Sequence, residues 1–344
     1  MEVRPELDDA HRAVLADWLS ARGDPRGELI NLELALDQPG RSSGERAALL
    51  ERLSALRGEL EPRWVAELAH TLELTHAQLH AFMPGRWYAG LLLELALCPS
   101  AELATGDVAL VLLEWILASE AAVAVEVIDA GEFPGQAILE QLATGPARPR
   151  IRRLVLGDHH APVGPLRQLN GQLDGLRQLE VRGPGIELAG FEAPALEVLR
   201  LCCRGDWSSP LRSIQGLRCP AMTRLELRFD QESSAYAEFH DPVAQVEPWL
   251  VAGLLDPVAL PRLCELVLAS FVCDASLIQA LVAASGFSRL RRLSLSDVDL
   301  APNVVDAIRE RSECFAGLER LDIGHGGRWI VREQLSMLGN LNTY

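Results

Sequence analysis

The chain of 344 residues contains no lysine, so all 32 of its basic residues are arginines. It therefore lacks the phosphate-binding lysine of a P-loop, the phosphate-pairing lysine of a kinase and any lysine for a Schiff base. The seven cysteines include no C-x-x-C pair and no Cys/His cluster at zinc spacing. We expect no cofactor and no metal site.

Targeting and membrane signals are also missing. The first residues, Met1–Asp9, are acidic and have no long apolar core, so they do not resemble a signal peptide. The longest apolar stretches, Leu91–Cys98 and Val108–Ala118, each contain a Glu and fall short of the roughly 20 residues of a spanning helix. We expect no membrane insertion and a cytoplasmic location, where an odd number of thiols stays reduced.

The charge balance and the composition limit the kinds of partner and core. The 48 acidic residues outnumber the basic ones and give a net charge of −16, which disfavours nucleic acid as a partner. Hydrophobic residues make up 49% of the chain but aromatic residues only 5%. The sequence predicts a large aliphatic core.

Seven segments share the pattern apolar-x-x-apolar-x-apolar. Alternation over the last three positions is typical of a short strand with one buried face. Such a strand cannot bury its apolar face alone, so we expect the copies to stack on one another. The seven segments are Ile151–Leu156, Leu176–Val181, Leu196–Leu201, Met222–Leu227, Leu263–Leu268, Leu290–Leu295 and Leu318–Ile323.

Two degenerate copies precede these seven, one at Leu92, Leu95 and Leu97, the other at Ala122, Val125 and Val127. The middle apolar positions of all nine copies are 95, 125, 154, 179, 199, 225, 266, 293 and 321. Most of their separations are in or near the range of leucine-rich repeats.

The repeats predict an α/β fold over residues 71–325. We expect a leucine-rich-repeat solenoid of about nine irregular repeats, with short parallel strands on the concave face and an irregular helical or loop convex side. An insertion at residues 230–260 is either a solvent loop or part of the binding side, and Pro248–Leu255 within it is expected to form a short convex helix. The Asn that usually follows the strand of such repeats is absent, so the solenoid is expected to be irregular.

The first 70 residues predict a helical N-terminal cap. Gly23 is expected to end a first helix, and Asp24 is expected to cap a second that has Pro25 at its first position. A loop follows at 38–44. Ser42 or Ser43 then caps a third helix to about residue 60, and Pro62 starts a fourth. Residues 326–344 are expected to form a C-terminal cap that covers the open end of the sheet.

The segments Leu15–Leu19 and Arg22–Ile30 resemble the bacterial repeat-companion domain, a short module found ahead of leucine-rich repeats. Leu29 stands where Phe is more usual in that family. The resemblance covers about the first 40 residues. It implies a repeat protein of planctomycete or myxobacterial type and brings no catalytic residues with it. The glycine-rich segment from Gly23 to Gly27 is expected to be a structural turn.

Charged side chains at the second, third, fifth and seventh positions of the seven copies are expected to face the concave surface. They comprise ten arginines and six acids, the reverse of the overall charge balance. Two interpretations remain open: cross-strand ion pairing, or docking of an acidic segment of a protein partner, since arginine forks match carboxylates. The third-position residues Arg153, Arg224, Arg292 and Arg320 are the sharpest candidates. The complete candidate set is Arg153, Arg177, Arg200, Arg224, Glu226, Arg228, Arg292, Arg320 and Asp322.

Other candidate sites are weaker. Asp158-His159-His160 could suggest a metal or phosphoesterase site, but adjacent histidines rarely bind one ion without a further ligand. Cys202 and Cys203 are expected to point to opposite faces of a strand and to serve packing. No Ser-His-Asp or G-x-S-x-G arrangement occurs.

We therefore expect a non-enzymatic scaffold or adaptor for a protein partner. A self-assembling structural subunit and an enzyme with an unrecognised site are the alternatives.

Overall fold

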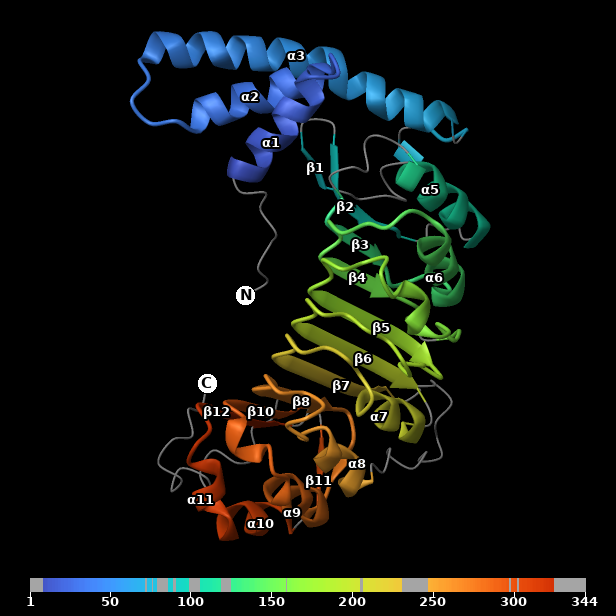
Figure 1. The fold of residues 1–344 in the computed structure, drawn as a ribbon, viewed down its shortest axis with the longest axis vertical. Helices are drawn as coiled ribbons and strands as arrows, with labels where there is room; N and C mark the ends of the chain where they lie inside the picture. The colour runs from blue at the N-terminus through green and yellow to red at the C-terminus, as the bar shows by residue number, and fades with distance from the viewer. Residues whose placement is uncertain are drawn as a thin grey trace. The chain divides into compact units, whose positions relative to one another are not determined.

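The computed structural model describes residues 9–71, 73–75, 77–78, 86–88, 91–98, 106–118, 125–158, 160–204, 207–230, 247–296, 298–301 and 303–324. These residues belong to two compact units, residues 1–127 and 128–344, and each is described by itself (Figure 1). The expected cap at 326–344, His159 and most of the insertion lie outside the described residues.

Three helices form the N-terminal part of the first unit, namely α1 (Asp9–Ser20), α2 (Pro25–Asp37) and α3 (Ser43–Thr71). Apolar side chains at three- and four-residue steps place Leu15 and Leu19 of α1 on one face. They are buried in one cluster with Ile30 of α2 and with Leu53 and Leu56 of α3. The predicted helical character of this region is confirmed.

The turn between α1 and α2 explains the Gly-Asp-Pro-Arg-Gly segment. Gly23 has φ +72° and ends α1 in the left-handed region that favours glycine. The Asp24 carboxylate accepts hydrogen bonds from the backbone N–H and from Nε of Arg26, both at 2.9 Å, and Pro25 occupies the first helical turn. A Cβ on Gly27 would lie 2.7 Å from the carbonyl oxygen of Ala16, so α2 needs glycine there to approach α1. The predicted cap and turn are confirmed.

Asp24→Ala is expected to lower the free energy of unfolding at pH 7 by about 1–2 kcal/mol, because both the cap and the arginine pair are lost. Asp24→Asn is the matched control, since asparagine also caps helices, and should cost less. Urea unfolding monitored by circular dichroism measures both values, and equal losses would contradict the capping role.

The Asp24 carboxyl group should also make the stability of the protein depend on pH. Burial alone would raise the pKa of Asp24, but hydrogen bonds and attraction from Arg26 outweigh it and hold the pKa below its usual value. The ionised Asp24 therefore adds stability above its unfolded pKa of about 3.9, and this is lost as the pH falls through the lower folded value. We expect the difference in free energy of unfolding between the wild type and Asp24→Asn to shrink in that acidic range.

Helix α3 begins at a capping box and is longer than expected. Ser42 Oγ accepts from the backbone N–H of Glu45 at 3.3 Å, and the Glu45 carboxylate accepts from Ser42 in return. Ser42 is thus the cap. The prediction that Pro62 starts a fourth helix was wrong, because α3 continues through it to Thr71. An interior proline removes one hydrogen bond and costs a helix about 3 kcal/mol, which intact flanking turns can offset.

The rest of the first unit contains β1 (Arg86–Tyr88), β2 (Leu91–Ala96) and α5 (Gly106–Ala118). The expected strand at Leu92, Leu95 and Leu97 is confirmed in part: all three leucines are buried, but β2 ends at Ala96, so Leu97 follows the strand. Strand β1, which pairs antiparallel with β2, was not predicted, because three residues carry no periodicity. Among the described residues, no helix has the length and hydropathy needed to cross a membrane.

The second unit is an α/β structure built on an open sheet. The strands follow the order β3-β4-β5-β6-β7-β8-β10-β12, so each strand lies beside its neighbour in the series, and all pairs from β4 to β12 are parallel. A short parallel pair, β9 (Val272–Cys273) and β11 (Asp299–Leu300), lies apart. The main strands are β3 (Val127–Ala130), β4 (Arg153–Leu156), β5 (Gln178–Pro184), β6 (Val198–Arg204), β7 (Arg224–Asp230), β8 (Glu265–Ala269), β10 (Arg292–Ser296) and β12 (Arg320–Gly324).

Strand β3 begins later than predicted. The expected strand had its middle apolar position at Val125, whereas the strand runs over Val127–Ala130 with Ile128 and Ala130 buried. The apolar run that includes Val125, Val127 and Ile128 fits the repeat pattern in two registers three residues apart. Sequence alone could not choose between them.

The seven clear repeats align in one register. Their fourth-position side chains form a leucine row, and the sixth-position side chains form a parallel row on the same face. All are 9% exposed or less, so they form the spine of the core. The leucine row is Leu154, Leu179, Leu199, Leu225, Leu266, Leu293 and Leu321.

A ladder of carbonyl groups fixes this register before each strand starts. The carbonyl oxygen of Arg152 accepts from the N–H groups of both Arg177 and Gln178, each at 2.8 Å. The same two-donor arrangement recurs at every later step, and the last one joins the Arg291 carbonyl to Glu319 and Arg320. Each repeat is thereby bonded to its neighbours in the series.

Helices and irregular segments cover the leucine side of the sheet. Figure 1 shows α6, α7 and α8 on the same side of the strands. Helix α8 is the short helix predicted in the insertion and is confirmed. The helical elements are α6 (Gly135–Thr144), η2 (Leu166–Leu169), α7 (Ser208–Ile214), α8 (Pro248–Gly253), α9 (Ala275–Ala283), η3 (Phe287–Arg289), α10 (Val304–Glu310) and α11 (Ser312–Phe315).

An aromatic cluster lies where the strands end and the expected asparagines are missing. Phe229 packs against Trp207 with ring centroids 4.2 Å apart and against Phe271 at 5.4 Å. The Trp207 indole N–H donates to the carbonyl oxygen of Cys203 at 3.1 Å. Phe271 thus fills a position that a regular repeat gives to a polar side chain, and its ring is buried together with those of Phe229 and Trp207.

Candidate functional site

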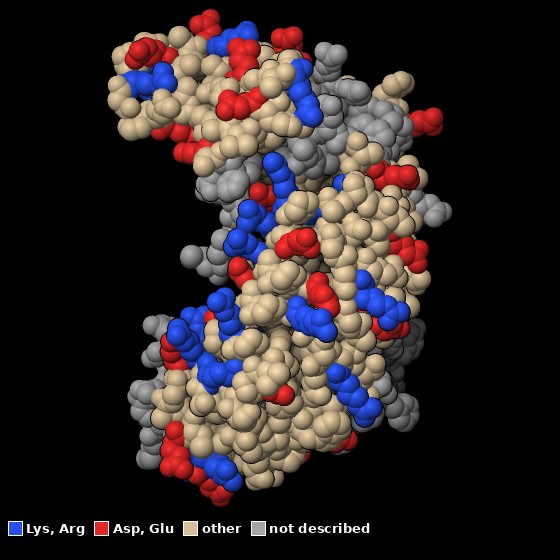
Figure 2. Space-filling view, in the orientation of Figure 1, with Lys and Arg blue, Asp and Glu red and all other residues tan. Residues whose placement is uncertain are grey.

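The exposed side of the sheet is formed by the third-, fifth- and seventh-position side chains of β4–β12, which we call the polar face. Side chains alternate along a strand, so these positions point away from the leucine row. Most of them are half-buried or exposed and many are charged. Figure 2 shows arginine and acidic side chains interspersed over this unit.

Ion pairs join the polar face from β5 to β10 into one alternating chain. Glu180 contacts Arg182 at 2.6 Å and Arg200 at 3.6 Å. Glu226 contacts Arg200 at 3.2 Å and Arg224 at 3.1 Å. Glu265 contacts Arg224 at 3.8 Å and Arg292 at 3.3 Å. Each of these three acids is therefore shared by two arginines.

Four of the predicted site residues, Arg200, Arg224, Glu226 and Arg292, belong to this chain of ion pairs. Two others, Arg320 and Asp322, form a separate pair at 2.7 Å on β12. The cross-strand pairing that was one of two interpretations is thus confirmed at the chain of ion pairs. Docking of an acidic segment stays a prediction.

Two further predicted residues lie outside the chain of ion pairs. Arg177 precedes β5, is exposed, and pairs with Glu197 at 3.3 Å. Arg153 lies on β4, half-buried, in the same register row as Arg224 but separated from it by Gln178 and Val198.

The third-position arginines do not form a continuous column. Glu265 stands between Arg224 and Arg292, whereas Arg292 and Arg320 are direct neighbours. One acid, Glu265, interrupts the row, and Glu226 and Asp322 of the fifth-position row pair with Arg224 and Arg320. Ion pairs within the sheet thus offset much of the row's positive charge.

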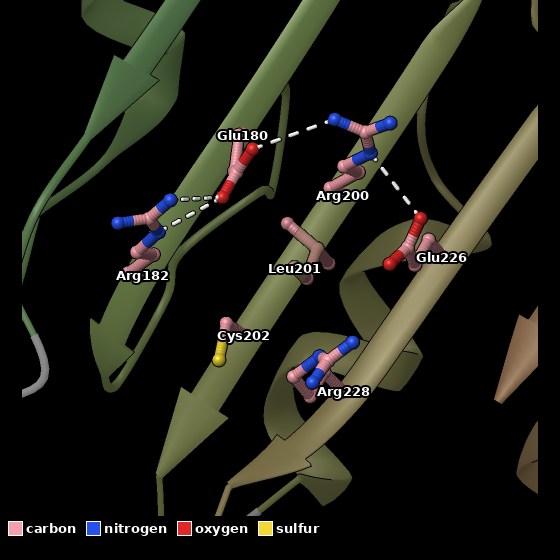
Figure 3. A pocket seen from close by; sticks show the side chains of 7 residues that line it. All are labelled: Glu180, Arg182, Arg200, Leu201, Cys202, Glu226 and Arg228. Atoms are coloured by element: carbon pink, nitrogen blue, oxygen red, sulfur yellow. Dashed lines mark hydrogen bonds and ion pairs between the residues drawn. The ribbon is translucent and has the colours of Figure 1, made fainter. Parts of the chain in front are cut away.

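A pocket of about 440 Å³ opens on the polar face over β5, β6 and β7. Figure 3 shows Arg200 between Glu180 and Glu226 along one side of the pocket, with Cys202 and Arg228 further along the strands. The lining residues are Glu180, Arg182, Arg200, Leu201, Cys202, Glu226 and Arg228. Three arginines against two glutamates give the lining a formal charge of +1 (3 − 2).

Arg182 is held firmly in its charged state at the edge of this pocket. Burial alone would lower the pKa of the guanidinium, but hydrogen bonds to Glu180 and the nearby charges of Glu180 and Asp129 outweigh it, so the pKa is raised. The Arg182 Nε and Nη2 atoms both donate to Glu180 Oε1, at 2.8 and 2.6 Å.

Arg228 differs from the other pocket arginines. It is exposed, and among the described residues it has no acidic partner. The reason lies in the register: Arg228 belongs to the seventh-position row, whose neighbouring members Arg182, Cys202 and Ala269 include no acid. Glu226, two residues before it on β7, is already shared by Arg200 and Arg224.

The position of Cys202 corrects the expectation that this cysteine serves packing. Strand β6 extends to Arg204, so alternation continues past the sixth position and Cys202 points to the polar face. It is half-buried, whereas Cys203 is buried, which confirms that the two thiols face opposite ways.

Other cysteines serve packing. Burial raises the pKa of Cys219 to about 11 and that of Cys273 to about 12, which keeps both as unreactive thiols at neutral pH.

The candidate set omitted four residues with polar or charged side chains that the structure places in the chain of ion pairs or in the pocket: Glu180, Arg182, Cys202 and Glu265. The signal for the two acids was their third- or fifth-position placement in the repeat pattern. The signal for Arg182 and Cys202 was the seventh position, which is useful only once the strands are known to extend that far.

The Asp158 loop is a local turn. Its carboxylate accepts from the backbone N–H groups of His160 at 2.9 Å and Ala161 at 2.8 Å. In the described part of the chain, no group of three or more His, Cys, Asp or Glu side chains could hold a metal ion.

Comparison with known proteins supports the fold alone. No family model matches the chain, and no curated protein matches it either. A solved structure of a Bacteroides fragilis protein from a structural genomics consortium is similar, with a TM-score of 0.50 and 13% identity over 67% of this chain and 68% of that one. The similarity is therefore one of fold, and an identity this low carries no function from one protein to the other.

Proposed function

We propose that the chain is a leucine-rich-repeat solenoid whose polar face binds a protein partner through an acidic segment, and that it acts as a non-enzymatic scaffold. The observation that carries this proposal is the polar face itself. It presents charged side chains in register across seven strands, and no described helix of the second unit covers them in Figure 1. Repeat proteins use such surfaces for binding.

The arrangement favours binding over chemistry. Arginine and glutamate side chains on the strands are mutually paired, which holds them in place before a partner arrives and reduces the entropy lost on binding. Rim charges of this kind chiefly set orientation and association rate.

The N-terminal helices fit a repeat-companion module of planctomycete or myxobacterial type, with the Gly23–Gly27 turn as a structural element. Seven cysteines, none of them in a disulfide, favour a reducing cytoplasm as the place of action.

The test is affinity capture from the native cell, followed by mass spectrometry, with three proteins. These are the wild type, a polar-face variant (Arg224→Glu with Arg292→Glu) and a surface control with the same charge change (Arg262→Glu with Arg309→Glu). We expect a protein that the wild type and the control retain and the polar-face variant loses, with at least tenfold less recovered.

Circular dichroism must first show that all three proteins are folded, because each new glutamate of the polar-face variant lies beside Glu265 or Glu226 and Arg309→Glu removes the partner of Asp306. A captured protein that all three retain equally would overturn the proposal that the polar face is the binding surface.

A further inference from the structure

We infer that the pocket over β5, β6 and β7 is an anchor subsite for a single carboxylate of the partner's acidic segment, bound by Arg228. This inference rests on the proposed function and names the contact that it uses. The chemical class of the occupant is an Asp or Glu side chain in an extended peptide.

The first argument is that one arginine is left over. Along the polar face of β5–β10 the acids Glu180, Glu226 and Glu265 are each shared by two arginines. Arg228 is the pocket arginine that makes no ion pair with a described residue. Its guanidinium can therefore give its fork of N–H donors to an incoming carboxylate without breaking an existing pair.

The second argument is charge. The pocket lining sums to +1, so one carboxylate neutralises it, whereas a phosphate dianion would leave an excess of negative charge beside Glu180 and Glu226. A chain of net charge −16 would repel most acidic ligands, which makes a locally positive pocket the place where one is accepted.

The third argument is space. The volume of about 440 Å³ is in the lower part of the range for ligand pockets, roughly 300–1,000 Å³. Arg182 and Arg228 stand on either side of Cys202, two strand spacings or roughly 10 Å apart. A peptide side chain can enter between them, above the Cys202 thiol.

The test measures binding of rhodamine-labelled deca-glutamate, with deca-glutamine as the uncharged control, by fluorescence anisotropy at low salt. We expect Arg228→Gln to weaken deca-glutamate binding about tenfold, which is the loss of one charge-assisted contact. Arg228→Lys keeps the charge without the fork and should fall between the two. Arg292→Gln, whose arginine is paired with Glu265, should change affinity less than about twofold. Glu226→Gln should tighten binding, because it removes a negative charge beside Arg228.

A second measurement locates the peptide. Deca-glutamate should slow alkylation of Cys202 by iodoacetamide in the wild type and not in Arg228→Gln, with Cys202→Ser identifying the modified thiol. Arg228 makes no ion pair with a described residue, so Arg228→Gln and Arg228→Lys remove no such pair. We expect both variants to fold as the wild type does.

Three results would overturn the inference. The first is no binding of deca-glutamate to the wild type. The second is equal losses for Arg228→Gln and Arg292→Gln, which would mean diffuse attraction to the polar face and would leave the proposed function standing. The third is Arg228-dependent displacement by inorganic phosphate at lower concentration than by peptide, which would assign the pocket to phosphate groups.

Discussion

Leu225→Ala is expected to lower the free energy of unfolding by about 3–4 kcal/mol, because it leaves a cavity in the middle of the leucine row. Leu225 is fully buried, and its register neighbours Leu199 and Leu266 are fully buried on either side. Neither neighbour can move into the space without disturbing its own strand. Urea unfolding monitored by circular dichroism measures the loss.

Leu321→Ala is the matched control, since it removes the same atoms from β12, the last strand of the order, where the leucine is 9% exposed. We expect about half the loss of Leu225→Ala, because one side of the cavity lies near solvent. Equal losses, or a loss below about 1 kcal/mol at Leu225, would contradict a continuous packed row.

Gly157→Ala is expected to cost about 3 kcal/mol or more. Gly157 directly follows β4 with φ +84°, and a Cβ there would lie 2.1 Å from the carbonyl oxygen of Arg182 on β5. The two strands would have to separate at the edge of the pocket. We expect the variant to unfold at lower urea concentration than the wild type.

Gly171→Ala separates backbone strain from the steric clash. Gly171 has a similar φ of +73°, but nothing lies within 4 Å of its Cβ position. Its cost should be limited to the left-handed conformation, about 1–2 kcal/mol. If both alanine variants lose the same amount, the close contact between β4 and β5 is not what requires glycine at 157.

The repeat pattern predicted the strands well because one short motif carried both periodicity and register. The leucine row from Leu154 to Leu321 matches the predicted middle positions of all seven clear copies. The repeat pattern predicted the wrong register at β3, where the apolar run fits the pattern in two registers. It also gave no sign of β1, and the proline at Pro62 suggested a break that neighbouring helical turns prevent.

The candidate site was predictable in composition but not in connectivity. The sequence shows which residues face the same way, but an ion pair also depends on which side-chain rotamers meet across the strands. Arg224 and Arg228 are both arginines on the polar face of β7, yet Arg224 is shared between Glu226 and Glu265 while Arg228 makes no ion pair with a described residue. To make that distinction, one must know which residues lie opposite each arginine and whether each nearby acid is already paired.

The alternating ion-pair chain also limits how this gene can change by losing or duplicating whole repeats. The carbonyl ladder is the same at each step, so the backbone would accept β5 placed directly beside β7. The side chains would not, since removing β6 takes out Arg200 and sets Glu180 against Glu226. Like charges directly opposite each other destabilise a sheet. The charged side chains therefore restrict which repeats can be neighbours, whereas the buried leucine positions are the same in every repeat.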